Sequence, residues 1–428
     1  MFLRELLSIS KSSIVSEGGN LSTNGHDAQH IDLKVHNRGT MVPLLNNLLV
    51  AISNAYKQQT SVPLWEPKLL QSNKFLSGSS LHFFNTSGIS DAEFVAKKPK
   101  VGDIDTQVNK AYEGDLEKFL TTHQGAKIGP AKLLGFERGN EQFSSLWELE
   151  NPPIKVQIDL EFVAFDQDEP TSWAQFSHSS SWDDLQAGVK GVFHKFLIQS
   201  LTGLTSQEFL LRKMVGRGKA RVEQDVPASG NMLSFAVSSK EGGGLRAKYE
   251  PVADETGQPI VKDGLPVMRE LPAQGYEQNI GNIFAKIFGK RMSPKHAAEL
   301  EKKFWSFTGL LDVMNTLLSP DEKQQVLESF IAKLFDKGAQ GLYKNDPDRD
   351  AAEKMAALTK MFEVTGLKTP ADLEQRIQEY KSSYKMKAEE VTEAEGAPDF
   401  KRKGIKHIHN PGSSTEISDR EFVEVMSR

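Results

Sequence analysis

The sequence of 428 residues contains no cysteine. Disulfide bonds, thiolate zinc sites, iron–sulfur clusters and cysteine nucleophiles are therefore excluded. The chain also lacks any apolar run near the ~20 residues that a membrane-spanning helix needs. Its apolar start is interrupted by Glu5 and has no signal-peptide pattern. A net charge of -5 gives no global basic field for nucleic acid, although a local basic patch stays open. These absences predict a protein of the cytoplasm that does not contact a membrane.

The composition is that of an ordinary folded protein, with 38% hydrophobic and 25% charged residues. The length corresponds to two or three domains at about 150 residues each. We predict an α/β (α+β) fold: a mixed-sheet core, a β-hairpin insertion and a C-terminal helical domain. The expected segments are an N-terminal arm (1–40), the core (41–222), the β-rich insertion (223–278), the helical domain (279–390) and a polar tail (391–428).

The periodicity of apolar residues predicts the elements of the core and of the helical domain. Helices follow from the spacing of leucines and other apolar residues, and from serine or aspartate just before proline, which marks helix starts. The expected strands cover 74–76, 102–109, 131–137, 142–149 and 154–165. The expected helices cover 40–57, 115–122 and 181–201, followed by starts at Ser293, Ser319, Asp346 and Thr369.

Acidic residues alternate with apolar ones in two of the expected strands. Asp103 and Asp105 share one face of the first strand, because alternate side chains of a strand point the same way. Two carboxylates at this spacing repel each other unless a cation lies between them. Asp159 and Glu161 share a face of a later strand in the same manner. If the two strands are neighbours, Asp159 completes a cluster suited to two divalent ions and in-line phosphoryl or nucleotidyl transfer.

A Gly-Ser pair, Gly78 and Ser79, lies upstream of these strands, where a short strand leads into a short helix. Backbone N–H groups at a helix start can bind phosphate. Gly78 would allow the backbone to approach a ligand closely, and Ser79 would offer a hydroxyl. Taken alone, the pair is better explained as a simple helix cap, and a lone Asp-x-Asp is common without a metal. The combination of the turn with the carboxylates is what favours a nucleotide site.

Taken together, Gly78-Ser79, Asp103 with Asp105, and Asp159 resemble the motifs of the DNA polymerase β-type nucleotidyltransferase superfamily. The resemblance covers about residues 74–165, under a quarter of the chain. The spacing from the Gly-Ser turn to the Asp-x-Asp is longer than usual in that family, and an insertion before it would explain the difference.

The basic stretch before the Asp-x-Asp, Lys97-Lys98-Pro99-Lys100, also resembles the approach to this motif in CCA-adding-type members. Haloacid-dehalogenase-type phosphatases and metal-dependent glycosyltransferases usually enter their Asp-x-Asp from an apolar strand instead. Neither of these two rival families fits the sequence well.

The resemblance implies a metal-dependent nucleotidyltransferase that moves an NMP group from an NTP to a hydroxyl acceptor. Asp103, Asp105 and Asp159 would be catalytic and would hold Mg²⁺ or Mn²⁺. Gly78, Ser79 and Lys190 would bind the nucleotide. The acceptor would be RNA, protein or a small molecule, and the sequence does not distinguish among them.

Two other interpretations stay open from the sequence. One is a non-catalytic binding or structural protein that retains the nucleotidyltransferase fold. The other is a metalloenzyme that uses the same carboxylates for a different phosphate-transfer or nucleic-acid-processing reaction. A cysteine-free chain with one catalytic module between unfamiliar flanks is typical of a bacteriophage protein. A phage-encoded protein would be located in the cytoplasm of the host.

Overall fold

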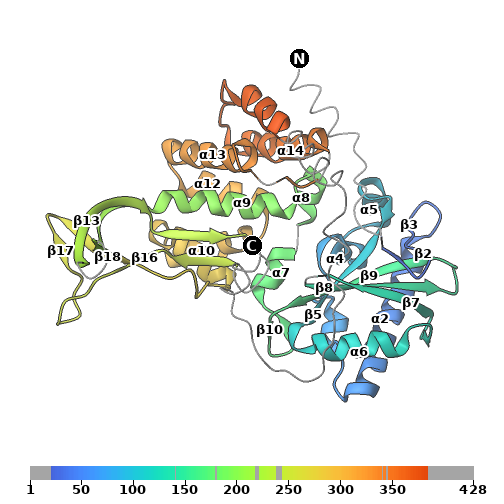
Figure 1. Ribbon diagram of the computed structural model, residues 1–428. Coiled ribbons are helices and arrows are strands. Elements are labelled where there is room, and N and C mark those ends of the chain that lie inside the picture. Colours follow the sequence, from blue (N-terminus) through green and yellow to red (C-terminus); the bar gives the residue numbers. More distant parts are fainter. Residues whose placement is uncertain are drawn as a thin grey trace, which may run out of the picture.

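The structure is a computed structural model that describes residues 21–383, except 140, 179–180, 217–220, 238–242, 340 and 344–345. The first half of the expected N-terminal arm and the whole polar tail therefore lie outside the described residues. The described chain is mixed α/β and contains a mixed five-stranded sheet, as predicted. The sheet and its helices lie on one side of the molecule, and a largely helical half lies on the other (Figure 1).

The five-stranded sheet has the order β5-β9-β8-β7-β6. β5 and β9 run parallel, and every other neighbouring pair is antiparallel. β5 and β9 therefore lie side by side although β6, β7 and β8 separate them in sequence. Four of the five predicted strands match to within two residues. The prediction over 74–76 was wrong, because these residues form a turn with a single bridge from Leu76 to Thr106, and β6 was not predicted. The bounds are β5 (Asp103–Asn109), β6 (Lys127–Ile128), β7 (Ala131–Arg138), β8 (Gln142–Leu149) and β9 (Lys155–Val163).

Two helices cover the apolar face of this sheet, α2 (Arg38–Thr60) and α6 (Glu113–His123). The leucine and isoleucine stripe of α2 recurs every three to four residues and is fully buried against side chains such as Ile104 and Trp147. Because apolar residues occupy alternate positions of each strand, the polar ones are left on the opposite face. The carboxylates of interest therefore point away from α2 and α6.

The chain crosses to the helical half through a short hairpin and α7 (Ser172–His178). The hairpin consists of β10 (Phe165–Asp166) and β11 (Glu169–Pro170). α7 lies against the polar face of the sheet, where the Gln107 side-chain amide donates a hydrogen bond of 2.9 Å to the Ala174 carbonyl. Gln107 is fully buried beneath it. This contact brings the helical half up to the face that carries the carboxylates.

The helix predicted over 181–201 is interrupted. α8 (Trp182–Ala187) ends at Gly188, which adopts a left-handed conformation with φ of 75°, and α9 (Gly191–Leu201) begins after it. Glycine takes this conformation without a steric penalty, so it ends a helix whose apolar spacing alone would continue. The continuous prediction was therefore wrong at this point.

The remaining helices share a single apolar cluster with α7 and α9. Proline occupies the first turn of three of them, as predicted from the sequence. The helical segment expected from Thr369 begins slightly later and covers 373–383. The bounds are α10 (Ile280–Phe288), α11 (Pro294–Lys303), α12 (Phe307–Leu317), α13 (Pro320–Phe335) and α14 (Pro347–Thr365).

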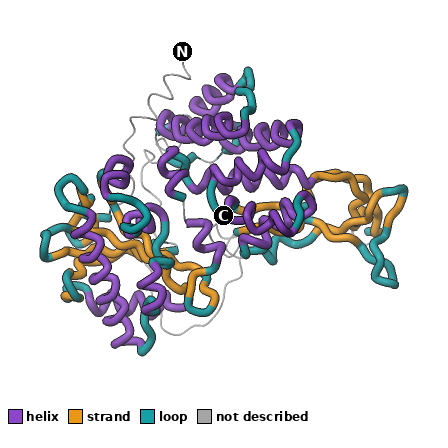
Figure 2. The backbone as a smooth tube through the Cα atoms, turned by 180° about the vertical axis from the view of Figure 1, so that it is seen from behind, coloured by secondary structure: helices purple, strands orange, loops and turns teal. Residues whose placement is uncertain are grey.

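A β lobe projects from the helical half (Figure 2). Its sheet has the order β13-β12-β18-β16, with β17 paired to β18. β12 was not predicted, because the apolar run at its centre, Phe209 to Leu211, breaks the alternation expected of a strand. The boundary expected at residue 222 falls within the paired strands β12 and β13, at the first residue of β13. The bounds are β12 (Ser206–Val215), β13 (Val222–Asn231), β16 (Tyr249–Pro251), β17 (Val261–Lys262) and β18 (Leu265–Glu270).

Short elements complete the described chain. β3 pairs with β4 just before the Asp-x-Asp, and β14 pairs with β15 beside α9. The bounds are β1 (Ser22–Thr23), β2 (His26–Asp27), β3 (Ile31–Asp32), α3 (Pro67–Ser72), α4 (Gly78–Phe84), α5 (Asp91–Lys97), β4 (Lys100–Val101), β14 (Leu233–Ala236) and β15 (Gly244–Ala247).

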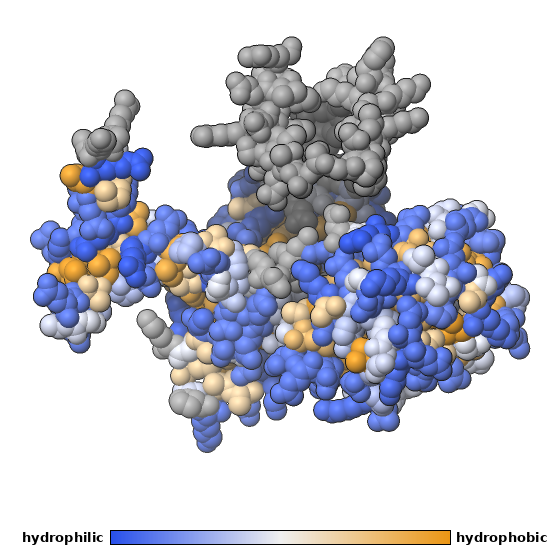
Figure 3. Space-filling model, turned by 60° about the horizontal axis from the view of Figure 1, so that its bottom comes forward, coloured by the Kyte–Doolittle hydropathy of each residue, from blue (hydrophilic) through white to orange (hydrophobic). Residues whose placement is uncertain are grey.

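Hydrophilic residues dominate the face seen in Figure 3, with small hydrophobic patches between them. Large exposed hydrophobic residues include Met214, Val222 and Val261, all on the β lobe. Among the described helices, none combines the length and apolar character needed to cross a membrane.

Candidate functional site

Three aspartates meet on the polar face of the sheet, at the beginning of β5 and the middle of β9. In the parallel pairing, Asp105 is the register partner of Asp159, and Asp103 precedes Asp105 by two residues on the same face. One carboxylate oxygen of each residue lies within 4.8 Å of the others. Two strands that are distant in the sequence thus bring the three predicted carboxylates together. We call Asp103, Asp105 and Asp159 the acidic cluster.

Burial and mutual repulsion disfavour the charged form of this cluster. Burial first, and then the charges of Asp103, Glu161 and Asp159, raise the pKa of Asp105 well above its ordinary value. Asp159 is only 6% exposed, and burial raises its pKa to about 6. Without a cation the cluster therefore retains protons to a higher pH than isolated carboxylates do. Such carboxylates are stabilised by any positive charge that approaches them.

Asp159 is held in place by neighbouring polar side chains. The Gln157 side-chain amide donates a hydrogen bond of 2.8 Å to Asp159 Oδ1. Gln157 Oε1 in turn accepts one of 3.0 Å from the backbone N–H of Leu21. A further hydrogen bond from Ser144 helps to lower the pKa of Asp159, opposing the effect of burial. Fixed donors of this kind restrict the orientation of a carboxylate and so prepare its second oxygen for a ligand.

The Gly-Ser turn lies directly beside the acidic cluster. The segment before it runs along the free edge of β5: the Gln107 N–H donates to the Phe75 carbonyl, and the Ser77 N–H donates to the Asp105 carbonyl at 3.1 Å. α4 then begins at Gly78, whose φ of 55° favours glycine. Ser80 Oγ accepts a hydrogen bond of 2.9 Å from the Asp105 N–H. The turn and the Asp-x-Asp strand are thus joined by several hydrogen bonds.

Lys98, one of the lysines in the basic stretch before the Asp-x-Asp, is a cation at this site to which the sequence pattern assigned no role. Its ammonium group donates a hydrogen bond to Ser79 Oγ. Its side chain is buried, and its charge favours ionised Asp105, lowering the pKa of that carboxyl. The basic stretch before the Asp-x-Asp was the available signal. Which of its lysines turns inward was decided by the packing of α5 and β4.

Glu161 is a fourth carboxylate, next to the acidic cluster on β9. Ser77 Oγ donates a hydrogen bond of 2.9 Å to Glu161 Oε2. Lys195 of α9 approaches the same carboxylate, and its ammonium group donates to the Ser177 carbonyl at 3.0 Å. Burial lowers the pKa of Lys195 to about 8, while Glu161 opposes that shift. Strand alternation had placed Glu161 on this face, but Lys195 as its partner could not be inferred from spacing.

Lys190, predicted to bind the nucleotide, contacts the helical half instead. Its ammonium group hydrogen-bonds to the Tyr343 hydroxyl and lies 3.2 Å from Glu353 Oε2. The lysine of α9 whose charge interacts with a carboxylate of β9, that of Glu161, is Lys195, five residues further along the chain. The structure thus brings together the three aspartates, Gly78 and Ser79. Lys190 instead forms an ion pair with Glu353 of α14.

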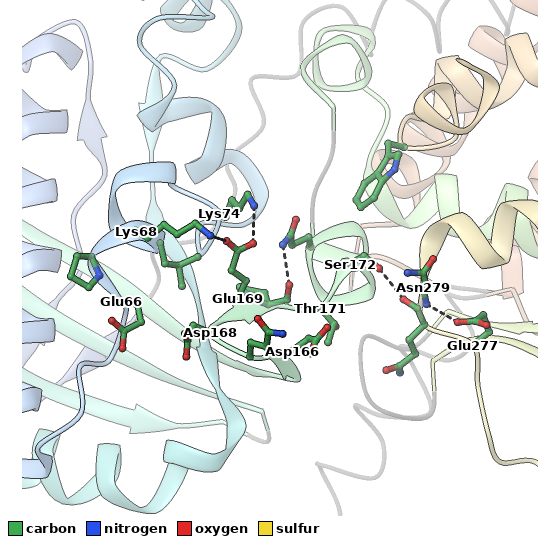
Figure 4. A pocket seen from close by; sticks show the side chains of 17 residues that line it. Glu66, Lys68, Lys74, Asp166, Asp168, Glu169, Thr171, Ser172, Glu277 and Asn279 are labelled. Carbon is green, nitrogen blue, oxygen red and sulfur yellow. Dashed lines mark hydrogen bonds and ion pairs between the residues drawn. The ribbon is translucent and has the colours of Figure 1, made fainter. Parts of the chain in front are cut away.

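A separate cavity of about 1150 Å³ opens where the chain crosses to the helical half (Figure 4). Residues of α3, the β10–β11 hairpin, the start of α7 and the segment before α10 line it, together with Trp305. Glu169 binds two lysines at its rim, Lys74 at 2.7 Å and Lys68 at 3.4 Å. None of the three aspartates of the acidic cluster lines this cavity. We therefore assign the candidate chemistry to the cluster and not to the cavity.

The acidic cluster, the Gly-Ser turn and Lys98 form one connected set of side chains on β5, β9, α4 and the residue that follows α5. Oxygen ligands of this kind are the ones that Mg²⁺ and Mn²⁺ prefer, so the cluster could hold such an ion. Comparison of the chain with protein-family models, curated proteins and solved structures finds no match, so the function is inferred from these residues.

Proposed function

We propose that this protein is a metal-dependent nucleotidyltransferase of the DNA polymerase β type, which moves an NMP group from an NTP to a hydroxyl acceptor. The observation that carries the proposal is the convergence of Asp103, Asp105 and Asp159 to within 4.8 Å from two neighbouring parallel strands. A Gly-Ser turn packed against the first of these strands supports it.

The cluster suits divalent cations for electrostatic reasons. Three buried or half-buried carboxylates repel one another, and this repulsion is relieved when cations share them. An octahedral Mg²⁺ ion with oxygens at about 2.1 Å keeps its ligand atoms about 3 to 4 Å apart, so small side-chain rotations suffice to close the cluster. When bound, such ions would activate the acceptor hydroxyl and neutralise the triphosphate and the pyrophosphate that leaves.

The residues of the chain have distinct roles in this proposal. Asp103 and Asp105 present their carboxylates from one strand to hold both ions. Asp159, oriented by Gln157, would hold the ion that activates the acceptor hydroxyl. Ser79 and Lys98 offer a hydroxyl and a positive charge to the phosphates, because both lie at the turn next to Asp105.

The test is transfer of label from α-³²P-labelled NTPs, with RNA, DNA, protein and small-molecule pools separated afterwards. The wild type and Asp115→Asn, which alters an exposed carboxylate on α6, should transfer label only with Mg²⁺ or Mn²⁺. Asp105→Ala should transfer none while circular dichroism shows an intact fold. Transfer that survives in Asp105→Ala would refute the assignment, and the labelled pool identifies the acceptor.

A non-catalytic protein with the same fold predicts a different result. Divalent metal and NTP would together raise the melting temperature, and Asp103→Asn would abolish that rise, but no pool would gain label. Metal-dependent stabilisation without label transfer would therefore replace the enzymatic proposal with a binding function.

A further inference from the structure

Glu161 joins three elements that meet at the acidic cluster. It belongs to β9, two residues after Asp159, and so shares that residue's face of the sheet. Its carboxylate accepts a hydrogen bond of 2.9 Å from Ser77 Oγ, at the residue that begins the Gly-Ser turn. Lys195 of α9 faces it with a positive charge. One side chain thus links the metal-binding strand, the turn and the helical half.

The partners of Glu161 differ from those of the three aspartates. The oxygens that come together for a cation belong to Asp103, Asp105 and Asp159, and Glu161 is outside that group. Its carboxylate accepts a charge-assisted hydrogen bond, of the short and directional type, from the Ser77 hydroxyl, and its charge interacts favourably with that of Lys195. A negative charge next to an acidic cluster is unfavourable unless a cation balances it, and Lys195 supplies that cation.

Ser77 is well placed to transmit the effect of Glu161. Ser77 is 1% exposed, and its N–H donates to the carbonyl of Asp105, so its backbone and its side chain bind two neighbouring strands. Gly78, the next residue, adopts the left-handed conformation that turns the chain into α4. Fixing Ser77 therefore fixes the direction in which Ser79 and the backbone of the turn point.

We infer that Glu161 is a positioning residue: through Ser77 it holds the Gly-Ser turn in the geometry that receives the triphosphate, and it is not a metal ligand. This inference rests on the proposed function and deepens it, because it separates the carboxylates that bind metal from the one that arranges the nucleotide site. Removing the Ser77–Glu161 hydrogen bond should weaken NTP binding and leave the affinity for the metal unchanged.

The experiment compares Mn²⁺ affinity, KM for the NTP and kcat in the full-length protein. Glu161→Ala and Ser77→Ala should each raise KM about tenfold, the effect of about 1.4 kcal/mol. Both should keep kcat and the Mn²⁺ dissociation constant within about threefold of the wild type. Glu161→Gln retains an oxygen acceptor for Ser77 and should restore most of the affinity for the NTP. Glu137→Ala, which removes an exposed carboxylate near the end of β7, is the matched control and should change nothing.

The double variant Ser77→Ala/Glu161→Ala distinguishes a shared role from two separate ones. If both residues act through one hydrogen bond, its KM should equal that of either single variant, whereas independent effects would multiply to about a hundredfold. Asp159→Asn serves as the reference for loss of Mn²⁺ binding.

Three results would overturn the inference while leaving the nucleotidyltransferase proposal intact. They are a loss of Mn²⁺ affinity in Glu161→Gln comparable to that in Asp159→Asn, a multiplicative double variant, and an unchanged KM in Glu161→Ala and Ser77→Ala. A wild-type protein that neither binds nor turns over any NTP would instead refute the proposed function, and this inference with it. If Glu161→Ala does not fold, Ser77→Ala and Glu161→Gln carry the same comparison.

Discussion

Replacing Asp159 by asparagine should stabilise the metal-free protein, although it removes a residue that we place in the active site. Asp159 is 6% exposed, and its pKa is raised from 3.8 to about 6. A raised pKa means that the folded state retains a proton that the unfolded state releases. The associated stability is therefore complete below pH ~4 and is lost as the pH rises through about 6. The difference between the two pKa values corresponds to about 3 kcal/mol.

The asparagine side chain has the same shape without the charge. Its Oδ1 can still accept the hydrogen bond from Gln157, so the variant avoids most of the electrostatic cost. At pH 7.5 in EDTA, Asp159→Asn should be more stable than the wild type by up to about 3 kcal/mol. Excess Mg²⁺ should reverse the order. At a concentration of about a hundred times the dissociation constant, it stabilises the wild type by about 2.7 kcal/mol and the variant by much less.

Differential scanning calorimetry at pH 5 and pH 7.5, with EDTA and with MgCl₂, measures these effects. The wild type should melt at a lower temperature at pH 7.5 than at pH 5 in EDTA, and the variant should show a smaller difference. Asp115→Asn is the control for a neutralised carboxylate that is exposed, on the surface of α6, where Asp115 pairs with Lys118. A variant less stable than the wild type at pH 7.5 in EDTA would show that Asp159 is not strained by its surroundings, and the electrostatic reasoning would fail.

Three further outcomes are expected. Lys98→Met should raise KM for the NTP about tenfold in steady-state kinetics. It should also move Mn²⁺ binding to higher pH, because the charge that favours ionised Asp105 is lost. An unchanged pH dependence of Mn²⁺ binding would contradict this prediction. In the wild type, the affinity for Mn²⁺ measured by titration should rise from pH 5 to pH 7 and then level off. The reason is that Asp159, with a pKa of about 6, must lose its proton before it binds a cation. Equal affinities at pH 5 and pH 7 would argue against this site. Asp184→Ala should destabilise the helical half by about 2–4 kcal/mol in chemical denaturation. The reason is that its buried carboxylate accepts hydrogen bonds from two backbone N–H groups at the start of α12. Asp183→Ala, which removes an exposed carboxylate, should have little effect.

Periodicity along the chain was enough to predict much of the core. Alternation placed Asp103 with Asp105, and Asp159 with Glu161, on single faces of their strands before any strand pairing was known. The bounds of β8 were predicted without error, and proline marked the first turns of three helices. Such features depend on neighbours in the sequence, which is why sequence patterns capture them.

Apolar spacing failed to predict two features of the chain. The apolar spacing from 181 to 201 did not reveal that α8 ends at Gly188, since spacing does not record a left-handed backbone. β12 pairs with β13 and β18, which are both later parts of the chain. The partners that make it a strand therefore lie outside the stretch of sequence that contains it.

The sequence by itself determined which residues could supply charge to a site and which face of each strand they would occupy. Only the tertiary structure decided that β5 and β9 lie side by side in parallel, with Asp105 opposite Asp159. It also decided that Lys195 faces Glu161, and that Lys190 pairs with α14. The physical reason is that the repeat of a strand or helix orients a side chain relative to its own backbone, whereas its partner is chosen when apolar faces distant in sequence pack together.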